Sequence, residues 1–297
     1  MKLKKLPFSV YDCFTKYSFG GNVGAIVWNA NNLNKDQMQN IAKEFNAPVT
    51  GYVIKEQGNI VTVRFFMPTS EINMCGHVTI GLFTDLSMRK INYSQKYKLK
   101  VPSGDIEVCV KKNENNIPTV MFSIDVPLSI KINLDLLEIA EALQVSISDI
   151  NSSIPVEAYD SGIKHLFINL IDEEKLKTLS PNFEYLKDIS RKIGIQTIAC
   201  FTFKESELLK KIKIRDFCPI LGVNETPASG TTNAALTAYL LNNDLITKHS
   251  QTIIAEQGNE IGRPSKIFTE LEVDNDLITN LKIGGNAILS YSGNVQY

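Results

Sequence analysis

Two short runs place a nucleophile-type side chain directly before a glycine at the predicted start of a helix. They are Cys75-Gly76-His77 and Ser229-Gly230-Thr231. A helix N-terminus has unpaired backbone N–H groups and the positive end of the helix dipole, and both attract carboxylates. Glycine lets a ligand approach the backbone closely. The two runs therefore predict a site for a small carboxylic acid, with Cys75, His77 and Ser229 beside it.

Each run ends a longer motif in which an Arg precedes Phe-x-Pro and a loop leads into the helix. The copies span residues 66–81 and 217–232, and 154 residues separate Gly76 from Gly230, about half of the 297-residue chain. Repetition at this distance indicates a duplication. Core packing gives no reason to repeat polar residues at these positions, so we expect the two copies to contribute to one active site.

Proton transfer is the chemistry that these side chains suggest. A helix N-terminus lowers the pKa of a thiol, which makes Cys75 a candidate base, with His77 as the alternative. Glu225 is expected to bind a substrate amino or hydroxyl group or to act as a second acid, and Ser229 completes the catalytic candidates. The candidate substrate-binding residues are Asn22, Gly76, Val78, Thr226, Gly230 and Thr231. The structural alternatives are a core Cys75, a structural His77, a Ser229 that only caps its helix and a turn Asn22.

Composition bounds the remaining possibilities. A net charge of −1 with 21% charged residues gives no reason to expect a nucleic-acid or membrane partner. Five Cys without a CxxC pair indicate reduced thiols in a cytoplasmic protein, and three His without ligand spacing predict no metal site.

Hydrophobic patterning predicts an α+β fold of two similar domains, each a mostly antiparallel, barrel-like sheet around a central helix. The domains are predicted at residues 1–128 and 129–297, with the last strand able to return to the first domain. Expected helices, with their caps where the sequence suggests one, are 35–45 (Asn34), 76–87, 134–143 (Asn133), 182–193 and 231–241. The last strand is predicted over 280–291.

The sequence resembles the PhzF-like (phenazine-biosynthesis) family, which shares its fold with diaminopimelate epimerase and proline racemase. The resemblance rests on these motifs: Tyr11-Asp12-Cys13-Phe14-Thr15, Gly21-Asn22-Val23-Gly24, Arg64 to Pro68, Glu71, Cys75-Gly76-His77, Pro219, Glu225-x-Pro227, Gly230, Gln257-Gly258 and Gly262-Arg263-Pro264-Ser265. It implies an active site between two domains, a cofactor-independent proton shift on a small amino or hydroxy acid, and a homodimer.

Two departures from that family bear on the chemistry. Val49 stands where PhzF-type isomerases have their catalytic Glu, and Thr226 replaces the Asp of their Glu-Asp-Pro element. The stretch Glu225-Thr226 to Ser229-Gly230 is instead similar to the epimerase pattern Glu-Thr-x-x-Cys-Gly. The leading interpretation is an isomerase that uses Cys75 or His77. The alternatives are a catalytically lapsed protein that binds a small carboxylate or acts as a scaffold, and an amino-acid racemase or epimerase.

Overall fold

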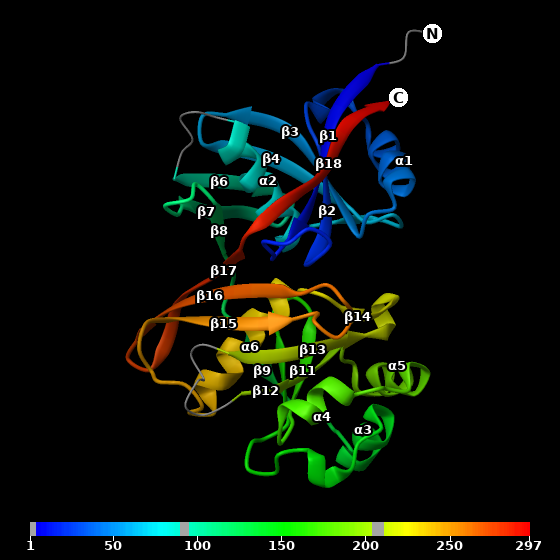
Figure 1. Cartoon of the computed structure of the whole chain (residues 1–297), viewed down its shortest axis with the longest axis vertical. Helices are drawn as coiled ribbons and strands as arrows, with labels where there is room; N and C mark the ends of the chain where they lie inside the picture. Colours follow the sequence, from blue (N-terminus) through cyan, green and yellow to red (C-terminus); the bar gives the residue numbers. More distant parts are fainter. Residues whose placement is uncertain (1–3, 90–94, 204–210) are drawn as a thin grey trace. The chain divides into compact units, whose positions relative to one another are not determined.

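A computed structural model describes residues 4–89, 95–203 and 211–297. The chain divides into two compact units, each described here by itself (Figure 1). The N-terminal unit comprises residues 1–123 and 284–297, and the C-terminal unit comprises residues 124–283. The sequence placed this boundary five residues later, at 128/129. Within the described ranges, no helix has the length and apolar character needed to cross a membrane.

The N-terminal unit is built on one mixed sheet. Its strands, in order of pairing, are β18 (Ala287–Gln296), β1 (Lys5–Cys13), β2 (Asn22–Val27), β3 (Val49–Gln57), β4 (Ile60–Phe66), β6 (Lys96–Val101), β7 (Gly104–Lys112) and β8 (Pro118–Ser123). The pairs β2–β3 and β4–β6 are parallel and the others are antiparallel. The short β5 (Glu71–Ile72) pairs with the end of β4.

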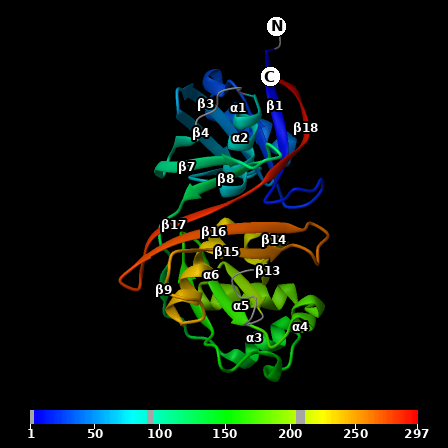
Figure 2. The same ribbon diagram turned by 60° about the vertical axis from the view of Figure 1, so that its left-hand side comes forward.

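Two helices cover opposite faces of this sheet. On one face α2 (Gly76–Arg89) contacts β1, β2, β3, β7, β8 and β18, and it is buried from Val78 to Ser87 (Figure 2). On the other face α1 (Lys35–Phe45) buries Met38 and Ile41 against the sheet, and the one-turn η1 (Ala30–Asn32) precedes it. Asn34 caps α1 as predicted, by accepting a hydrogen bond from the backbone N–H of Gln37 at 2.9 Å.

The C-terminal unit repeats this order of strand pairing. Its strands, in order, are β9 (Leu128–Ile130), β10 (Glu157–Asp160), β11 (Lys164–Asn169), β12 (Thr197–Thr202), β13 (Ile212–Cys218), β15 (Gln251–Gln257) and β16 (Ser265–Asp274). The pairs β11–β12 and β13–β15 are parallel. The short β14 (Val223–Thr226) pairs with the end of β13, as β5 does with β4.

The helix α6 (Gly230–Asn242) occupies the position in this unit that α2 has in the other. It is buried from Thr232 to Leu241 and contacts β9, β10, β11 and β16. The opposite face of the sheet carries α5 (Phe183–Ile193), which is capped by Asn182 and packs against α3 (Leu136–Leu143). The remaining elements are η2 (Ile147–Asp149), α4 (Glu173–Thr178) and η4 (Pro219–Leu221).

Most strand pairs are antiparallel, as predicted, but the sheets are mixed, because the crossover through a helix that joins β2 to β3, and likewise β11 to β12, makes those strands parallel. The structure corrects two predictions about the elements. The cap of α3 is Asp135 and not Asn133, since Asp135 Oδ1 accepts from the backbone N–H of Leu137 at 2.9 Å. The strand predicted over 280–291 is two strands, β17 (Leu277–Gly285) and β18, separated by Asn286, whose side-chain amide donates to Pro118 O at 2.8 Å.

Candidate active site

The first motif forms the start of α2, where the sheet and the helix approach closely. A Cβ at Gly24 of β2 would lie 3.1 Å from Val78 Cγ2 and 3.4 Å from His77 Cδ2. A side chain at this position would press the first turn of α2 outward by a few tenths of an ångström, so Gly24 allows the close approach. The hydroxyl of Thr79 donates to the carbonyl of Cys75 at 2.8 Å, which fixes the backbone immediately before the helix.

Cys75 and His77 lie side by side at this helix start. Cys75 Sγ is 3.3 Å from His77 Nδ1 and 3.5 Å from Nε2. Burial raises the pKa of the Cys75 thiol to about 12, although the backbone N–H groups of Val78 and His77 act in the opposite direction. The predicted lowering of the Cys75 pKa is therefore wrong in this structure, because desolvation of the thiolate outweighs the helix terminus.

His77 has the opposite character. Burial lowers its pKa to about 4, with a hydrogen bond to the backbone of Val23 acting weakly against this shift. Near neutral pH the imidazole is neutral, so one ring nitrogen carries a lone pair that can accept a proton. Of the two candidate bases, His77 is thus the one in the correct protonation state.

The other candidates of the N-terminal unit surround this pair. Asn22 begins β2 and is adjacent to Val23, which bonds His77. Val49 begins β3, is 6% exposed and pairs in register with Gly24. Gly76 and Val78 are the first and third residues of α2. The first motif therefore brings together Asn22, Cys75, Gly76, His77 and Val78, with apolar Val49 beside them.

The second motif forms the start of α6, where Ser229 is the N-cap. Ser229 Oγ accepts from the backbone N–H of Thr232 at 3.2 Å and lies 3.1 Å from Thr231 Oγ1. The side-chain amide of Asn233 donates to the carbonyl of Ser229 at 2.8 Å, the same role that Thr79 has for Cys75. The cap that the sequence offered as an alternative for Ser229 is present, and its hydroxyl is only partly buried.

Glu225 of β14 is bound by an arginine on both of its oxygens. Arg215 Nε donates to Glu225 Oε1 at 3.0 Å and Arg215 Nη2 donates to Oε2 at 2.7 Å. The other terminal nitrogen of Arg215 donates to the carbonyl of Leu179 at 2.7 Å. Arg64 and Glu71 form the same two-bond pair in the first motif. The arrangement favours a structural role for Glu225 in holding the loop and does not favour a second acid.

Thr226 and the residues after it lie in a loop that a distant segment fixes. Gln257 Nε2 donates to Thr226 O at 2.9 Å, and the hydroxyl of Ser265 donates to Pro227 O at 2.7 Å. Gly258 has a φ of +78°, and a Cβ there would lie 2.6 Å from Pro227 O. The Gln-Gly and Gly-Arg-Pro-Ser motifs thus position the loop that delivers Ser229.

A set of buried polar residues lies behind Ser229, and the sequence candidates did not include three of them, Thr197, Asp216 and Thr232. Thr232 Oγ1 donates to Asp216 Oδ2 at 2.6 Å, and His165 Nδ1 lies 2.7 Å from Thr197 Oγ1. A signal was available, because the alignment of Arg64 with Arg215 places Asp216 opposite the apolar Phe65.

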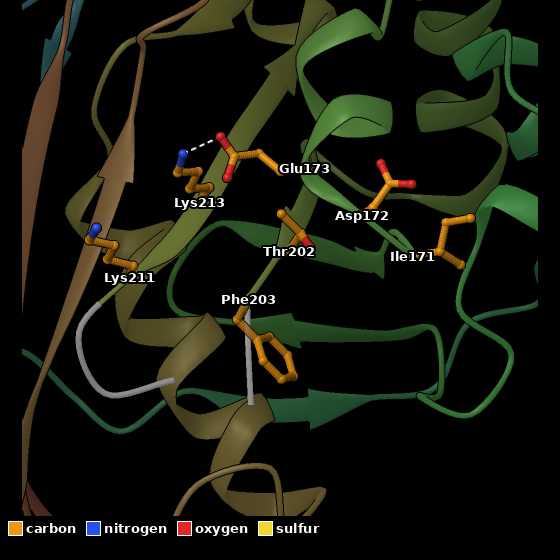
Figure 3. A pocket seen from close by; sticks show the side chains of 7 residues that line it. All are labelled: Ile171, Asp172, Glu173, Thr202, Phe203, Lys211 and Lys213. Atoms are coloured by element: carbon orange, nitrogen blue, oxygen red, sulfur yellow. Dashed lines mark hydrogen bonds and ion pairs between the residues drawn. The ribbon is translucent and has the colours of Figure 1, made fainter. Parts of the chain in front are cut away.

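A separate cavity of about 330 Å³ lies between α4, β12 and β13 (Figure 3). It is lined by Ile171, Asp172, Glu173, Thr202, Phe203, Lys211 and Lys213. Two of its acidic side chains already have partners. Glu173 pairs with Lys213, and Asp172 Oδ1 accepts from the backbone N–H of Lys175 at 2.8 Å and so caps α4. None of the candidate residues lines it. Among the described residues, no three His, Cys, Asp or Glu side chains form a group that would hold a metal ion.

Comparison with known proteins agrees with this framework. A family model described as phenazine biosynthesis-like protein matches residues 11–293. Trans-2,3-dihydro-3-hydroxyanthranilate isomerase from Pseudomonas fluorescens is 26% identical over 97% of this chain and 98% of its own length. A Bacillus anthracis protein of the PhzF family has the same fold, with a TM-score of 0.89 at 22% identity over 98% of this chain and 99% of that one.

Fold similarity extends to a hydroxyproline epimerase from Agrobacterium vitis, with a TM-score of 0.64 at 10% identity over 98% of this chain and 92% of that one. The resemblance predicted from the sequence motifs is confirmed for the family and for the wider fold. The similarity to a named isomerase supports an isomerase at the level of the family. With the family model matching nearly the whole length, the chain belongs to the PhzF family of phenazine biosynthesis-like proteins.

Proposed function

We propose that this protein is a cofactor-independent isomerase that moves a proton on a small amino or hydroxy carboxylic acid, with His77 as the base. The observation that carries the proposal is the position of the His77 ring at the start of α2, with Nδ1 3.3 Å from Cys75 Sγ, where burial lowers the pKa of the imidazole. A substrate carboxylate bound at this helix N-terminus would raise the pKa of His77 toward neutrality. His77 would then hold the proton long enough to return it to a different atom.

The proposed step is balanced within substrate and imidazole. His77 takes a proton from a carbon near the carboxylate, the C–H electron pair moves into a conjugated system, and the imidazolium returns the proton to another carbon. Cys75 remains a thiol next to the ring. Ser229, Gly230 and Thr231 of the second motif are proposed to bind a carboxylate at the start of α6, with Thr226 as a further contact and Glu225 anchoring the loop. Asn22 is proposed as a further contact near the start of α2.

Solvent exchange tests the proposal across a whole class of acids at once. The purified protein is incubated in heavy water with a panel of small amino and hydroxy acids that includes trans-2,3-dihydro-3-hydroxyanthranilate, and deuterium uptake is followed by NMR and mass spectrometry. We expect uptake at one carbon of at least one acid with the wild-type protein and none with the His77→Gln variant. Absence of uptake across the panel, or equal uptake by the variant, would contradict the proposal.

A protein that binds a carboxylate without catalysis is the second candidate, and two observations favour it. Val49 is buried and apolar at the position of the family Glu, and the thiol of Cys75 has a pKa of about 12. Saturable binding of an acid without deuterium uptake would support this candidate. Uptake that is accompanied by loss of optical activity would instead support a racemase or epimerase.

A further inference from the structure

A cluster of four buried polar side chains lies behind the N-terminus of α6. His165 of β11, Thr197 of β12, Asp216 of β13 and Thr232 of α6 are each less than 5% exposed. Desolvation makes such groups costly unless they bond one another, and these do. They form a network between the sheet and the first turn of α6, and this network reaches Ser229, the N-cap of the helix.

The equivalent positions in the N-terminal unit are apolar. His165 pairs in register with Thr197, which begins β12, just as Gly24 pairs with Val49, which begins β3. Asp216 follows the paired Arg215 on β13, as Phe65 follows the paired Arg64 on β4, and Thr232 is the third residue of α6 as Val78 is of α2. The same framework therefore carries a polar network behind one helix start and apolar packing behind the other.

The network contains a continuous chain of hydroxyl groups that ends at the half-buried Ser229. Thr232 Oγ1 is 2.6 Å from Asp216 Oδ2 and 2.8 Å from Ser229 Oγ. One hydroxyl has one proton, so Thr232 can donate to only one of these neighbours at a time. When Asp216 is ionised, Thr232 donates to it and can accept from Ser229. When Asp216 is protonated, it donates to Thr232, Thr232 donates to Ser229, and the Ser229 proton is free to point elsewhere.

The surroundings of Asp216 allow both states near neutral pH. Burial raises its pKa to about 6, against the hydroxyls of Thr232 and Thr197, and Oδ1 accepts no hydrogen bond within the described part of the chain. The charged group that acts on it is Glu225, which is itself paired with Arg215.

The remaining titratable groups around Asp216 are uncharged near neutral pH. Burial lowers the pKa of His165 to about 3, so its imidazole is neutral. Burial raises the pKa of the Cys200 and Cys218 thiols well above the usual range. The protonation state of Asp216 is therefore the variable charge in this cluster.

We propose that Asp216 is a positioning residue that acts through Thr232 to set the direction of the Ser229 hydroxyl: Ser229 donates inward when Asp216 is ionised and is free to donate to a bound carboxylate when Asp216 is protonated. The inference rests on the proposed function only in assigning Ser229 to the substrate. It gives a role to a serine, a weak acid by itself, at the position in the second motif that Cys75 has in the first.

A thiol at position 229 reports this coupling without any substrate. In the Ser229→Cys variant, the rate of alkylation by iodoacetamide at this position is measured from pH 5 to 9 by mass spectrometry, with the five native Cys as internal references. We expect an inflection near pH 6 in addition to ionisation of the thiol, because ionised Asp216 disfavours a neighbouring thiolate. Adding Asp216→Asn should remove this inflection and raise the rate at pH 7.5 roughly 3- to 10-fold.

Matched variants separate the hydroxyl chain from simple proximity. Thr232→Ser keeps the hydroxyl and should keep the inflection, whereas Thr232→Val should abolish it. Ser161→Ala removes a hydroxyl that contacts His165 Nε2 at 2.9 Å but neither Asp216 nor Ser229, and it should change nothing. If Asp216→Asn does not fold, the Thr232 pair still decides the question.

Two results would overturn the inference. They are an inflection that persists without Asp216, and equal behaviour of Thr232→Val and Thr232→Ser. Failure of the proposed function gives a different result, in which the coupling is present but no acid exchanges deuterium.

Discussion

The N-termini of α2 and α6 share a backbone framework but differ in what lies behind them. Each helix follows an Arg–Glu pair. In each, the carbonyl of the residue before the helix accepts a hydrogen bond from a side chain one turn into the helix. Behind α2 the packing is apolar, and it leaves His77 neutral and Cys75 protonated. Behind α6 a polar network reaches Ser229. The repeated backbone framework therefore fixes the direction of the N–H groups at each helix start, and the buried residues behind the helix determine which side chain can accept or donate a proton.

The largest difference in stability between equivalent variants of the two units is expected at their Arg–Glu pairs. Arg215 and Glu225 have side chains 8% and 5% exposed, against 31% and 20% for Arg64 and Glu71. Glu225→Gln leaves a buried guanidinium without its counter-charge and should lower the free energy of unfolding by about 3–5 kcal/mol. Glu71→Gln should cost about 1 kcal/mol or less. Urea denaturation of both variants measures this, and equal losses would show that burial does not distinguish the pairs.

His77 and Cys75 provide the next test, within the first motif. For an acid that exchanges deuterium, His77→Gln should reduce kcat/KM at least about 100-fold, whereas Cys75→Ser should act much less. The pH dependence of kcat/KM reports the free enzyme, in which the pKa of His77 is about 4, so kcat/KM should fall only as the pH drops toward that value and should be level above it. A rate that keeps rising through alkaline pH, and loses that rise in Cys75→Ser, would instead identify the thiolate as the base.

The raised pKa of Asp216 predicts that the stability of the protein depends on pH. Its folded-state pKa of about 6 lies above the ordinary value of 3.8, so the folded state binds this proton more tightly than the unfolded state does. The resulting stability is present below about pH 4 and is lost as the pH rises through about 6. Asp216→Asn should therefore become more stable than the wild type by about 1–3 kcal/mol at pH 8, with little difference near pH 4.

The control for this prediction is Ser161→Ala, which changes the same cluster without changing its charge. Its stability relative to the wild type should be independent of pH. An Asp216→Asn difference that is the same at pH 4 and pH 8 would show that the carboxyl group does not titrate in this range.

Much of the framework of this comparison was predictable from the sequence. The Asn34 cap and the helix starts after Cys75 and Ser229 follow from local signals. Capping and periodicity depend on residues a few positions apart, which a single sequence displays directly.

The surroundings of the site depend on contacts that local signals do not carry. Asp216 touches Thr232 across 16 residues, and His165 approaches Thr232 across 67. The pKa of Cys75 was predicted in the wrong direction because the helix terminus is visible in the sequence and the extent of burial is not.

The smallest effect is expected at Thr79, in a comparison of the side chains that fix the carbonyl before each helix. Thr79→Val removes one hydrogen bond to Cys75 O, but that oxygen still accepts from the backbone N–H of Thr79 at 3.1 Å, so the loss should be below about 1 kcal/mol. Asn233→Leu also removes the bond from Asn233 Nδ2 to the buried Gln257 Oε1 at 3.2 Å. That oxygen is left without this donor, and the expected loss is about 1–3 kcal/mol. Urea denaturation should rank Asn233→Leu below Thr79→Val in stability, and the reverse order would show that Gln257 gains little from this contact.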